Sequence, residues 1–201
     1  MTNAAPTRIY LVRHGQVEGF EDKRYNGQGD VLLTELGLAQ FQALRARLAD
    51  KPLRAIYSSD LTRCLCGAKT LAEPHGLTPV ATADLRELHI GEWEGLTWKD
   101  LQRRYPRQWQ ERLDDIVNYR TPGGENLVDV AARVRPVISR ILADHAGQEV
   151  AVVGHGGVNR VILCHALGLD LANMISLQQD YGCLNIIDYR ADSRLVRLIN
   201  G

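Results

Sequence analysis

The sequence has no long apolar run, no excess of charge of one sign and few cysteines. No stretch approaches the ~20 apolar residues that a membrane-spanning helix requires. Residues Met1 to Thr7 are polar and lack the apolar core of a signal peptide, so we expect a cytoplasmic protein. Lys and Arg together number 24, as do Asp and Glu, which leaves no basic surplus for nucleic acid or an anionic membrane. A small anionic molecule stays possible as a partner, because it needs only a local basic cluster. The oligomeric state is left open.

The four cysteines lack the spacing of a metal or redox motif. Cys64 and Cys66 lie two residues apart in an expected helix and therefore point to different faces. We expect all four to be reduced and most of them to be buried. No cluster of carboxylates and histidines indicates a metal either, so the sequence predicts neither a metal nor another cofactor.

Strand-like and helix-like segments alternate along the chain. Five segments have the apolar pattern of strands: Arg8–Arg13, Arg54–Tyr57, Val150–Val153, Cys183–Tyr189 and Arg194–Ile199. The third is a short continuous apolar run, which is typical of a strand covered on both faces. A hairpin-like connection, residues 191–193, separates the last two and predicts an antiparallel edge.

Helical patterns fall between these strands. We expect helices that begin at the caps Thr34, Ser59 and Asn126, and a fourth over Val158–Leu167. The first helix has an apolar stripe that is expected to face the core: Leu38, Phe41, Leu44 and Leu48.

This alternation predicts an α/β fold, a three-layer α/β/α sandwich with a mainly parallel sheet and an antiparallel edge strand. Residues from about 89 to 121 hold all three tryptophans and show no strand pattern. We expect them to form a small helical cover over the C-terminal ends of the strands. Residues 1–201 are expected to form a single domain.

Two of the expected strands end in a histidine that glycine follows. Arg13-His14-Gly15 follows the first strand, and Gly154-His155-Gly156-Gly157 follows the third. Ligands of open α/β sheets gather at the carboxyl ends of the strands, so the two histidines are expected to converge. Glycine lets a backbone N–H approach an anion closely, and the helix near Val158 points its positive end the same way. A lone histidine there is more often structural, whereas two at matched positions favour a functional site.

Two more segments bring charge to the same edge of the sheet. Arg63 falls in the first turn of a helix, where a cation opposes the helix dipole unless a bound anion compensates. Two arginines and two histidines around one point suit a phosphoryl group. Glu87 precedes the aromatic segment; a carboxyl group enclosed by Trp and Leu would have a raised pKa and suit a general acid. The alternative is a solvated glutamate.

Six segments keep the order of a known set of motifs. They are Leu11–Gly15, Gly27–Gly37, Tyr57–Arg63, Leu85–Gly95, Pro122–Asn126 and Val153–Gly157. In this order they resemble the histidine phosphatase superfamily, which includes phosphoglycerate mutases and many small phosphatases.

The resemblance implies a role for each matching position. His14 would be the nucleophile that forms a phosphohistidine. Arg13, Arg63 and His155 would bind the phosphoryl oxygens, and Glu87 would protonate the leaving oxygen. Gly156 would add a backbone contact to the phosphate, and Asn26 could replace an asparagine that many members carry near it. No metal would be needed, because arginine and histidine supply the positive charge.

Four positions depart from the family pattern. Many members have Glu and then Thr or Ser where this chain has Gln16 and Val17, an Asn where it has Phe20, and a Thr where it has Gly67. None of these holds one of the five principal roles. The departures therefore bear on the substrate more than on the chemistry.

The compact chain leaves only the short cover over the expected site, which favours hydrolysis over a mutase that must keep its phosphoenzyme dry. Residues Gly91–Leu101, Pro122–Asn126 and Leu184–Tyr189 are similar to α-ribazole phosphatases of cobalamin assembly. We therefore expect a phosphomonoesterase, with α-ribazole 5′-phosphate or a related small phosphorylated metabolite as substrate. A phosphoglycerate mutase-type phosphotransferase and a non-catalytic phospho-ligand binding protein are the alternatives. The aromatic cover would either stack on a flat substrate ring or simply anchor itself to the rest of the chain.

Overall fold

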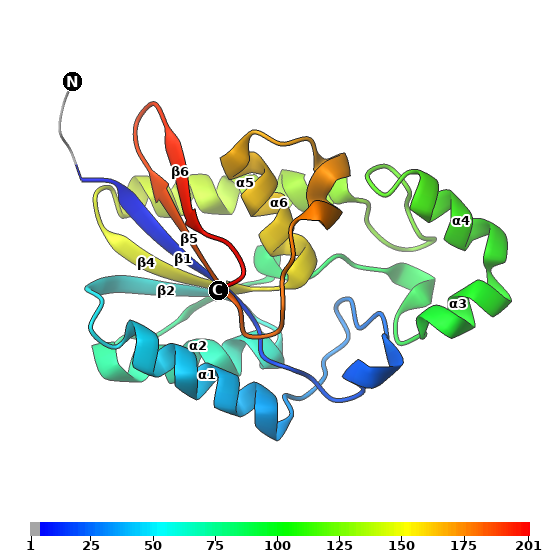
Figure 1. The fold of residues 1–201 in the computed structure, drawn as a ribbon, viewed down its shortest axis with the longest axis horizontal. Helices are drawn as coiled ribbons and strands as arrows, with labels where there is room; N and C mark the ends of the chain where they lie inside the picture. Colours follow the sequence, from blue (N-terminus) through cyan, green and yellow to red (C-terminus); the bar gives the residue numbers. More distant parts are fainter. Residues whose placement is uncertain (1–4) are drawn as a thin grey trace.

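The computed structural model describes residues 5–201. Residues 1–4, part of the polar N-terminal segment on which the expectation of no signal peptide depends, lie outside the described residues. Six strands form one sheet in the order β3-β2-β4-β1-β5-β6 (Figure 1). Their bounds are Thr7–Arg13 for β1, Leu53–Ser59 for β2, Val80–Thr82 for β3, Glu149–Gly154 for β4, Leu184–Tyr189 for β5 and Arg194–Leu198 for β6. All five expected strands are confirmed, and the short β3 is an addition.

The sheet is parallel over β3, β2, β4 and β1, whereas β5 and β6 form an antiparallel edge. β1 lies between β4 and β5, with Val12 opposite Val153 on one side and Leu184 on the other. The expected mainly parallel sheet with an antiparallel edge is therefore confirmed. The parallel strands end at the same edge, on the right in Figure 1.

The α-helices lie on both faces of the sheet and beyond its right-hand edge (Figure 1). They are α1 (Glu35–Leu48), α2 (Thr62–Ala72), α3 (Trp98–Arg104), α4 (Pro106–Asp114), α5 (Leu127–Asp144) and α6 (Gly156–Leu167). Five short 3-10 helices are η1 (Phe20–Asp22), η2 (Glu73–His75), η3 (Ala83–Leu85), η4 (Gly91–Trp93) and η5 (Leu171–Ser176).

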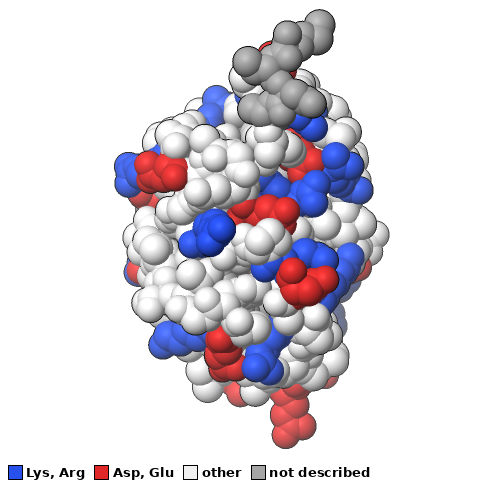
Figure 2. All heavy atoms as spheres, turned by 90° about the vertical axis from the view of Figure 1, so that its left-hand side faces the viewer, with Lys and Arg blue, Asp and Glu red and all other residues white. Residues whose placement is uncertain are grey.

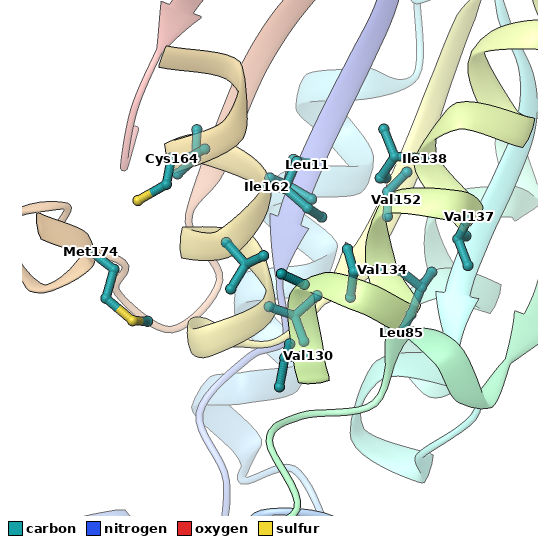
Figure 3. Close-up of a cluster of buried hydrophobic side chains, with 14 of the residues drawn as sticks. Leu11, Leu85, Val130, Val134, Val137, Ile138, Val152, Ile162, Cys164 and Met174 are labelled. Atoms are coloured by element: carbon teal, nitrogen blue, oxygen red, sulfur yellow. The ribbon is translucent and has the colours of Figure 1, made fainter. Parts of the chain in front are cut away.

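Two apolar layers hold the helices to the sheet. Alternate side chains of β1 point to opposite faces, so Ile9 and Leu11 join one layer and Tyr10 and Val12 the other. α5 and α6 cover the first layer, shown in Figure 3 with Leu11 and Val152 of the sheet near Val134 and Ile162 of the helices. α1 and α2 cover the second. The expected three-layer α/β/α arrangement is confirmed.

Local signals explain most of the helix boundaries, and two expectations need correction. The Thr34 hydroxyl accepts from the Gly37 N–H at 3.0 Å and caps α1, as expected. Leu38 does not belong to the buried stripe of α1, because it is 46% exposed. Ser59 does not cap α2: its hydroxyl accepts from the Leu61 N–H at 3.3 Å, and the helix begins at Thr62.

Helices α3 and α4 form the cover expected over residues 89–121. They lie beyond the carboxyl ends of the parallel strands (Figure 1). Trp93 is 1% exposed, and its ring lies 6.3 Å from that of Trp109 and 5.8 Å from that of Tyr119. Buried aromatic rings therefore anchor the cover, and Trp93 has no free face for a substrate ring.

Charges of both signs are interspersed at the other end of the molecule, where the strands begin (Figure 2). Asp188, almost wholly buried on β5, accepts from Arg8 at 2.6 Å and also pairs with Arg197. The described helices include none that is long and apolar enough to cross a membrane.

Candidate functional site

The two expected histidines come together at the carboxyl edge of the sheet. His14 directly follows β1, and His155 directly follows β4. Because β1 and β4 are parallel neighbours, the ends of both strands coincide, and the His14 N–H donates to the Gly154 carbonyl at 3.0 Å. The two imidazole rings lie 5.1 Å apart and are both buried. The expected convergence is present in the structure.

Arg13 lies half-buried beside His14. Its Nη1 donates to the Gln179 carbonyl at 2.5 Å, and its guanidinium carbon lies 4.0 Å above the ring of Tyr181. Its Nε is buried without a hydrogen-bond partner. Tyr181 also contacts His14, with 5.6 Å between the ring centroids. One side of the Arg13 guanidinium is therefore fixed, while a buried donor is left for a ligand.

Arg63, on the first turn of α2, is 2% exposed. Its Nη1 donates to the Gly29 carbonyl and its Nη2 to the Gly27 carbonyl, each at 2.7 Å. The loop that holds these carbonyls is fixed by Glu94, which accepts from the Gln28 N–H at 2.9 Å. Arg63 is thus oriented by neutral carbonyls, so its charge is not cancelled locally.

Neither Arg13 nor Arg63 forms an ion pair with an acidic side chain of residues 5–201. Two guanidinium groups without a counter-charge make an anion favourable at this point. Burial, followed by the charges of Arg13 and Arg63, holds the pKa of His14 well below its usual range. Burial, His14 and the arginines do the same to the pKa of His155. Both imidazoles are therefore neutral near pH 7.

Glu87 reaches the same edge from the segment after η3. Its Oε2 accepts from the Gly157 N–H in the first turn of α6, and its Oε1 accepts from the Leu88 N–H, both at 2.9 Å. A Cβ at Gly157 would lie 2.5 Å from Oε1, so glycine is needed for this approach. Both carboxylate oxygens are thus bound by backbone N–H groups. The sequence reasoning about Trp and Leu side chains around Glu87 did not foresee this polar setting.

The other two expected phosphate-binding positions lie close by. A Cβ at Gly156 would be 3.4 Å from the Arg13 guanidinium, so its backbone lies against that side chain. Asn26 lies in the loop that orients Arg63, where its carbonyl accepts from the Gly29 N–H at 2.7 Å. These contacts place the backbone of both residues next to the arginines.

Two of the departures from the family pattern, Gln16 and Gly67, have local structural reasons. The Gln16 carboxamide accepts from the Thr34 hydroxyl at 2.9 Å and ties the loop after His14 to the start of α1. A Cβ at Gly67 would lie 1.8 Å from the ring of Phe41, so α1 and α2 pack too closely there for a threonine. Phe20 lies in η1 and is 36% exposed.

The cysteines are free thiols, three of them buried. Cys64 lies behind the site, with its Sγ 3.4 Å from Nε2 of His155. Burial raises the pKa of this thiol well above its usual range, so it is a neutral neighbour of the imidazole. Within the described part of the chain, His, Cys, Asp and Glu side chains form no group of three that could hold a metal ion.

Sequence reasoning missed four residues that support the site. Gln179, Tyr181, Glu125 and Arg133 make contacts with Arg13 or with the segment that carries Glu87. They lie far along the chain from the residues that they contact, and no short motif signals them. The Gly-Gly pair after His155 was the one local signal for the approach of Glu87.

Comparison with known proteins identifies the family. The model of the histidine phosphatase superfamily (branch 1) matches residues 9–201. The chain therefore belongs to the histidine phosphatase superfamily.

Two curated proteins and one solved structure are similar to this chain. A bifunctional protein of Mycobacterium tuberculosis is 37% identical over 97% of this chain and 54% of its own length. This chain thus spans about half of that relative. The glucosyl-3-phosphoglycerate phosphatase of the same organism is 34% identical over 85% of this chain and 79% of its own length. A structure of a putative α-ribazole-5′-phosphate phosphatase from Escherichia coli is 25% identical, with a TM-score of 0.91 and coverage of 98% of this chain and 97% of that one.

Proposed function

We propose that the protein is a metal-independent phosphomonoester hydrolase that acts through a phosphohistidine on His14. The observation that carries the proposal is the pairing of a neutral, oriented His14 with two arginines that have no counter-charge. Nδ1 of His14 lies 2.8 Å from the Gly15 carbonyl, which can only accept. Nδ1 therefore carries the proton, and the lone pair of Nε2 is left for attack on phosphorus.

In the first step, Nε2 of His14 forms a bond to phosphorus as the ester P–O bond breaks. Glu87 acts as general acid: it gives a proton to the leaving alkoxide, so a neutral alcohol departs and Glu87 is left as the carboxylate. Arg13, Arg63 and His155 hold the phosphoryl oxygens while negative charge spreads over them.

In the second step, water attacks the phosphohistidine. The Glu87 carboxylate takes a proton from this water, the P–N bond breaks and the lone pair returns to Nε2. The backbone N–H groups of Gly157 and Leu88 keep the carboxylate oriented for this role. Inorganic phosphate leaves, and both His14 and Glu87 are restored.

For the substrate we propose a small organic phosphate monoester, with α-ribazole 5′-phosphate as the first candidate. The match in fold to the putative α-ribazole-5′-phosphate phosphatase supports it. The 34% identity to the glucosyl-3-phosphoglycerate phosphatase supports a second candidate, a phosphorylated and carboxylated sugar derivative. Trp93 is buried within the cover and cannot stack on a substrate ring. One reason to prefer a substrate with a flat ring is thereby removed.

The test is phosphate release in the presence of EDTA from four esters. They are α-ribazole 5′-phosphate, glucosyl-3-phosphoglycerate, 3-phosphoglycerate and 4-nitrophenyl phosphate. We expect wild type to release phosphate without metal and His14→Ala to lose at least ~10³-fold in kcat. His75→Ala, in η2 after the far end of α2, is the matched control and should keep full activity. Equal rates for wild type and His14→Ala would refute the phosphohistidine mechanism. Stimulation by a bisphosphate, with slow phosphate loss, would favour a mutase.

A further inference from the structure

Arg133, on α5, forms a partly buried ion pair with Glu125, which precedes this helix. The proposed chemistry has no role for this pair. The Nε of Arg133 lies 2.8 Å from Oε1 of Glu125 and its Nη2 lies 2.9 Å from Oε2, which is a two-point contact. The two side chains are 16% and 22% exposed. Burial acts to raise the pKa of Glu125, but Arg133 and the His89 N–H outweigh it and lower that pKa. The pair is therefore fully charged at neutral pH.

The same guanidinium also holds the backbone of the segment that leads to Glu87. Nη1 donates to the carbonyls of Asp84 at 2.8 Å and Arg86 at 2.7 Å. Nη2 donates to the carbonyl of Glu87 itself at 3.0 Å. Five hydrogen bonds in all thus leave one guanidinium, three of them to residues 84–87. Only an arginine has enough donors in a fixed plane to make them.

Glu125 completes the arrangement on the other side of Glu87. Its Oε2 accepts from the His89 N–H at 3.0 Å, and its own N–H donates to the His89 carbonyl at 2.8 Å. Arg133 and Glu125 therefore hold the chain before and after Glu87. Glu87 itself lies between η3 and η4, where the chain has no strand or helix to fix it.

We propose that Arg133, paired with Glu125, is a positioning residue that sets the place of the Glu87 carboxylate for proton transfer. The inference rests on the proposed function and adds a residue to it. A proton donor must lie within hydrogen-bond reach of the leaving oxygen, and a misplacement of about 1 Å can cost ~10²-fold in rate. Arg133 acts through the backbone of residues 84–87 and does not itself touch the phosphoryl group.

The leaving group of the ester gives a direct test. An alkyl phosphate releases a poor leaving group that needs a proton, whereas 4-nitrophenyl phosphate releases a stable anion that does not. We expect Arg133→Met to lower kcat/KM by ~10²-fold for an alkyl ester and only a few-fold for 4-nitrophenyl phosphate. Arg140→Met, an exposed arginine on the same helix, is the matched control and should change neither value.

A second variant and a double variant separate positioning from damage to the fold. Glu125→Gln keeps the shape of the pair and should show the same selective loss of kcat/KM on the alkyl ester. It therefore serves as the test variant in case Arg133→Met does not fold. Adding Arg133→Met to Glu87→Gln should cause no further loss on the alkyl ester, because the donor is already gone. Thermal melting of every variant checks folding.

Four outcomes would overturn the proposal. Equal losses on both esters, or a full additional loss in the Glu87→Gln background, would make Arg133 merely structural. Unchanged kcat/KM in folded Arg133→Met would also reject its role. If wild type hydrolyses neither ester, the proposed function fails and the positioning role falls with it. This failure of the proposed function is distinguishable from a failure of the Arg133 proposal, because it is seen in the wild-type protein before any variant is compared.

Discussion

Gly67 shows how one residue sets the distance between two helices. It lies on α2 against the ring of Phe41 on α1, and both residues are buried. Glycine in a helix interior costs about 0.5–1 kcal/mol relative to alanine. Here that cost is offset by the close approach of the Phe41 ring, which fills the space that a side chain would take. Phe41 on α1 is thus a reason for the missing threonine on α2.

We expect Gly67→Thr to lower the free energy of unfolding by about 1–3 kcal/mol, because the added atoms overpack a full interface. The measurement is urea denaturation followed by circular dichroism. In a Phe41→Ala background the same substitution should cost much less, since the ring is gone. An equal cost in both backgrounds would mean that Phe41 is not the obstacle.

The two histidines of the candidate site were predictable at the scale of single residues because they follow strands directly. His14 and His155 end two apolar runs, and the edge rule for parallel strands then brings them together. Arg133 was not predictable in this way. The backbone carbonyls that it binds in residues 84–87 lie 46–49 residues away along the chain, and an arginine on a helix is usually solvated.

At the scale of elements, the helix starts show which signals are local. Asn126 caps α5 with a reciprocal pair, in which its Oδ1 accepts from the Asp129 N–H at 3.0 Å and Asp129 accepts from the Asn126 N–H at 2.9 Å. This pattern is readable over three residues, so the sequence predicts it. The first N–H of α2 instead donates at 2.9 Å to Asp30, which comes from a distant loop. No local pattern reveals such a cap, and Ser59 was chosen wrongly for that reason.

The Asn126 cap gives a prediction for the element that carries Arg133. We expect Asn126→Ala to lower the free energy of unfolding by about 1 kcal/mol, because the Asp129 N–H loses its acceptor. Asn126→Ser keeps a hydrogen-bond acceptor and should lower the free energy of unfolding by only about a few tenths of 1 kcal/mol. Denaturant unfolding of the two variants beside wild type measures the difference. The capping role would be contradicted by equal losses for alanine and serine.

At the scale of the whole molecule, buried titratable groups make stability depend on pH. The pKa values of His14 and His155 lie well below the usual range in the folded protein. Below about pH 6.5 these histidines therefore bind protons in the unfolded chain but not in the native state. Asp188 has a pKa lowered by Arg8 and Arg197 against the effect of burial. Its stabilising contribution is lost at lower pH, as the carboxylate protonates. Both effects reduce stability as pH falls.

We expect the free energy of unfolding to fall between pH 7 and pH 5, by up to about 1.4 kcal/mol per pH unit for each buried histidine. His14→Gln should reduce this slope, because one of the two groups no longer titrates. Denaturant melts at a series of pH values would measure it. The same slope in wild type and variant would exclude His14 as a source.

The central place of β1 has a consequence for how the protein is made. His14 directly follows this strand, which leaves the ribosome before its neighbours β4 and β5, with Arg8 opposite Glu149 and Thr7 opposite Tyr189. At roughly 5–20 residues per second, synthesis reaches β4 about 7–27 seconds after β1 is complete. Until then Ile9 and Leu11 have no sheet to join, and His14 has no second histidine beside it. A nascent chain thus holds no assembled candidate site until translation has passed β4.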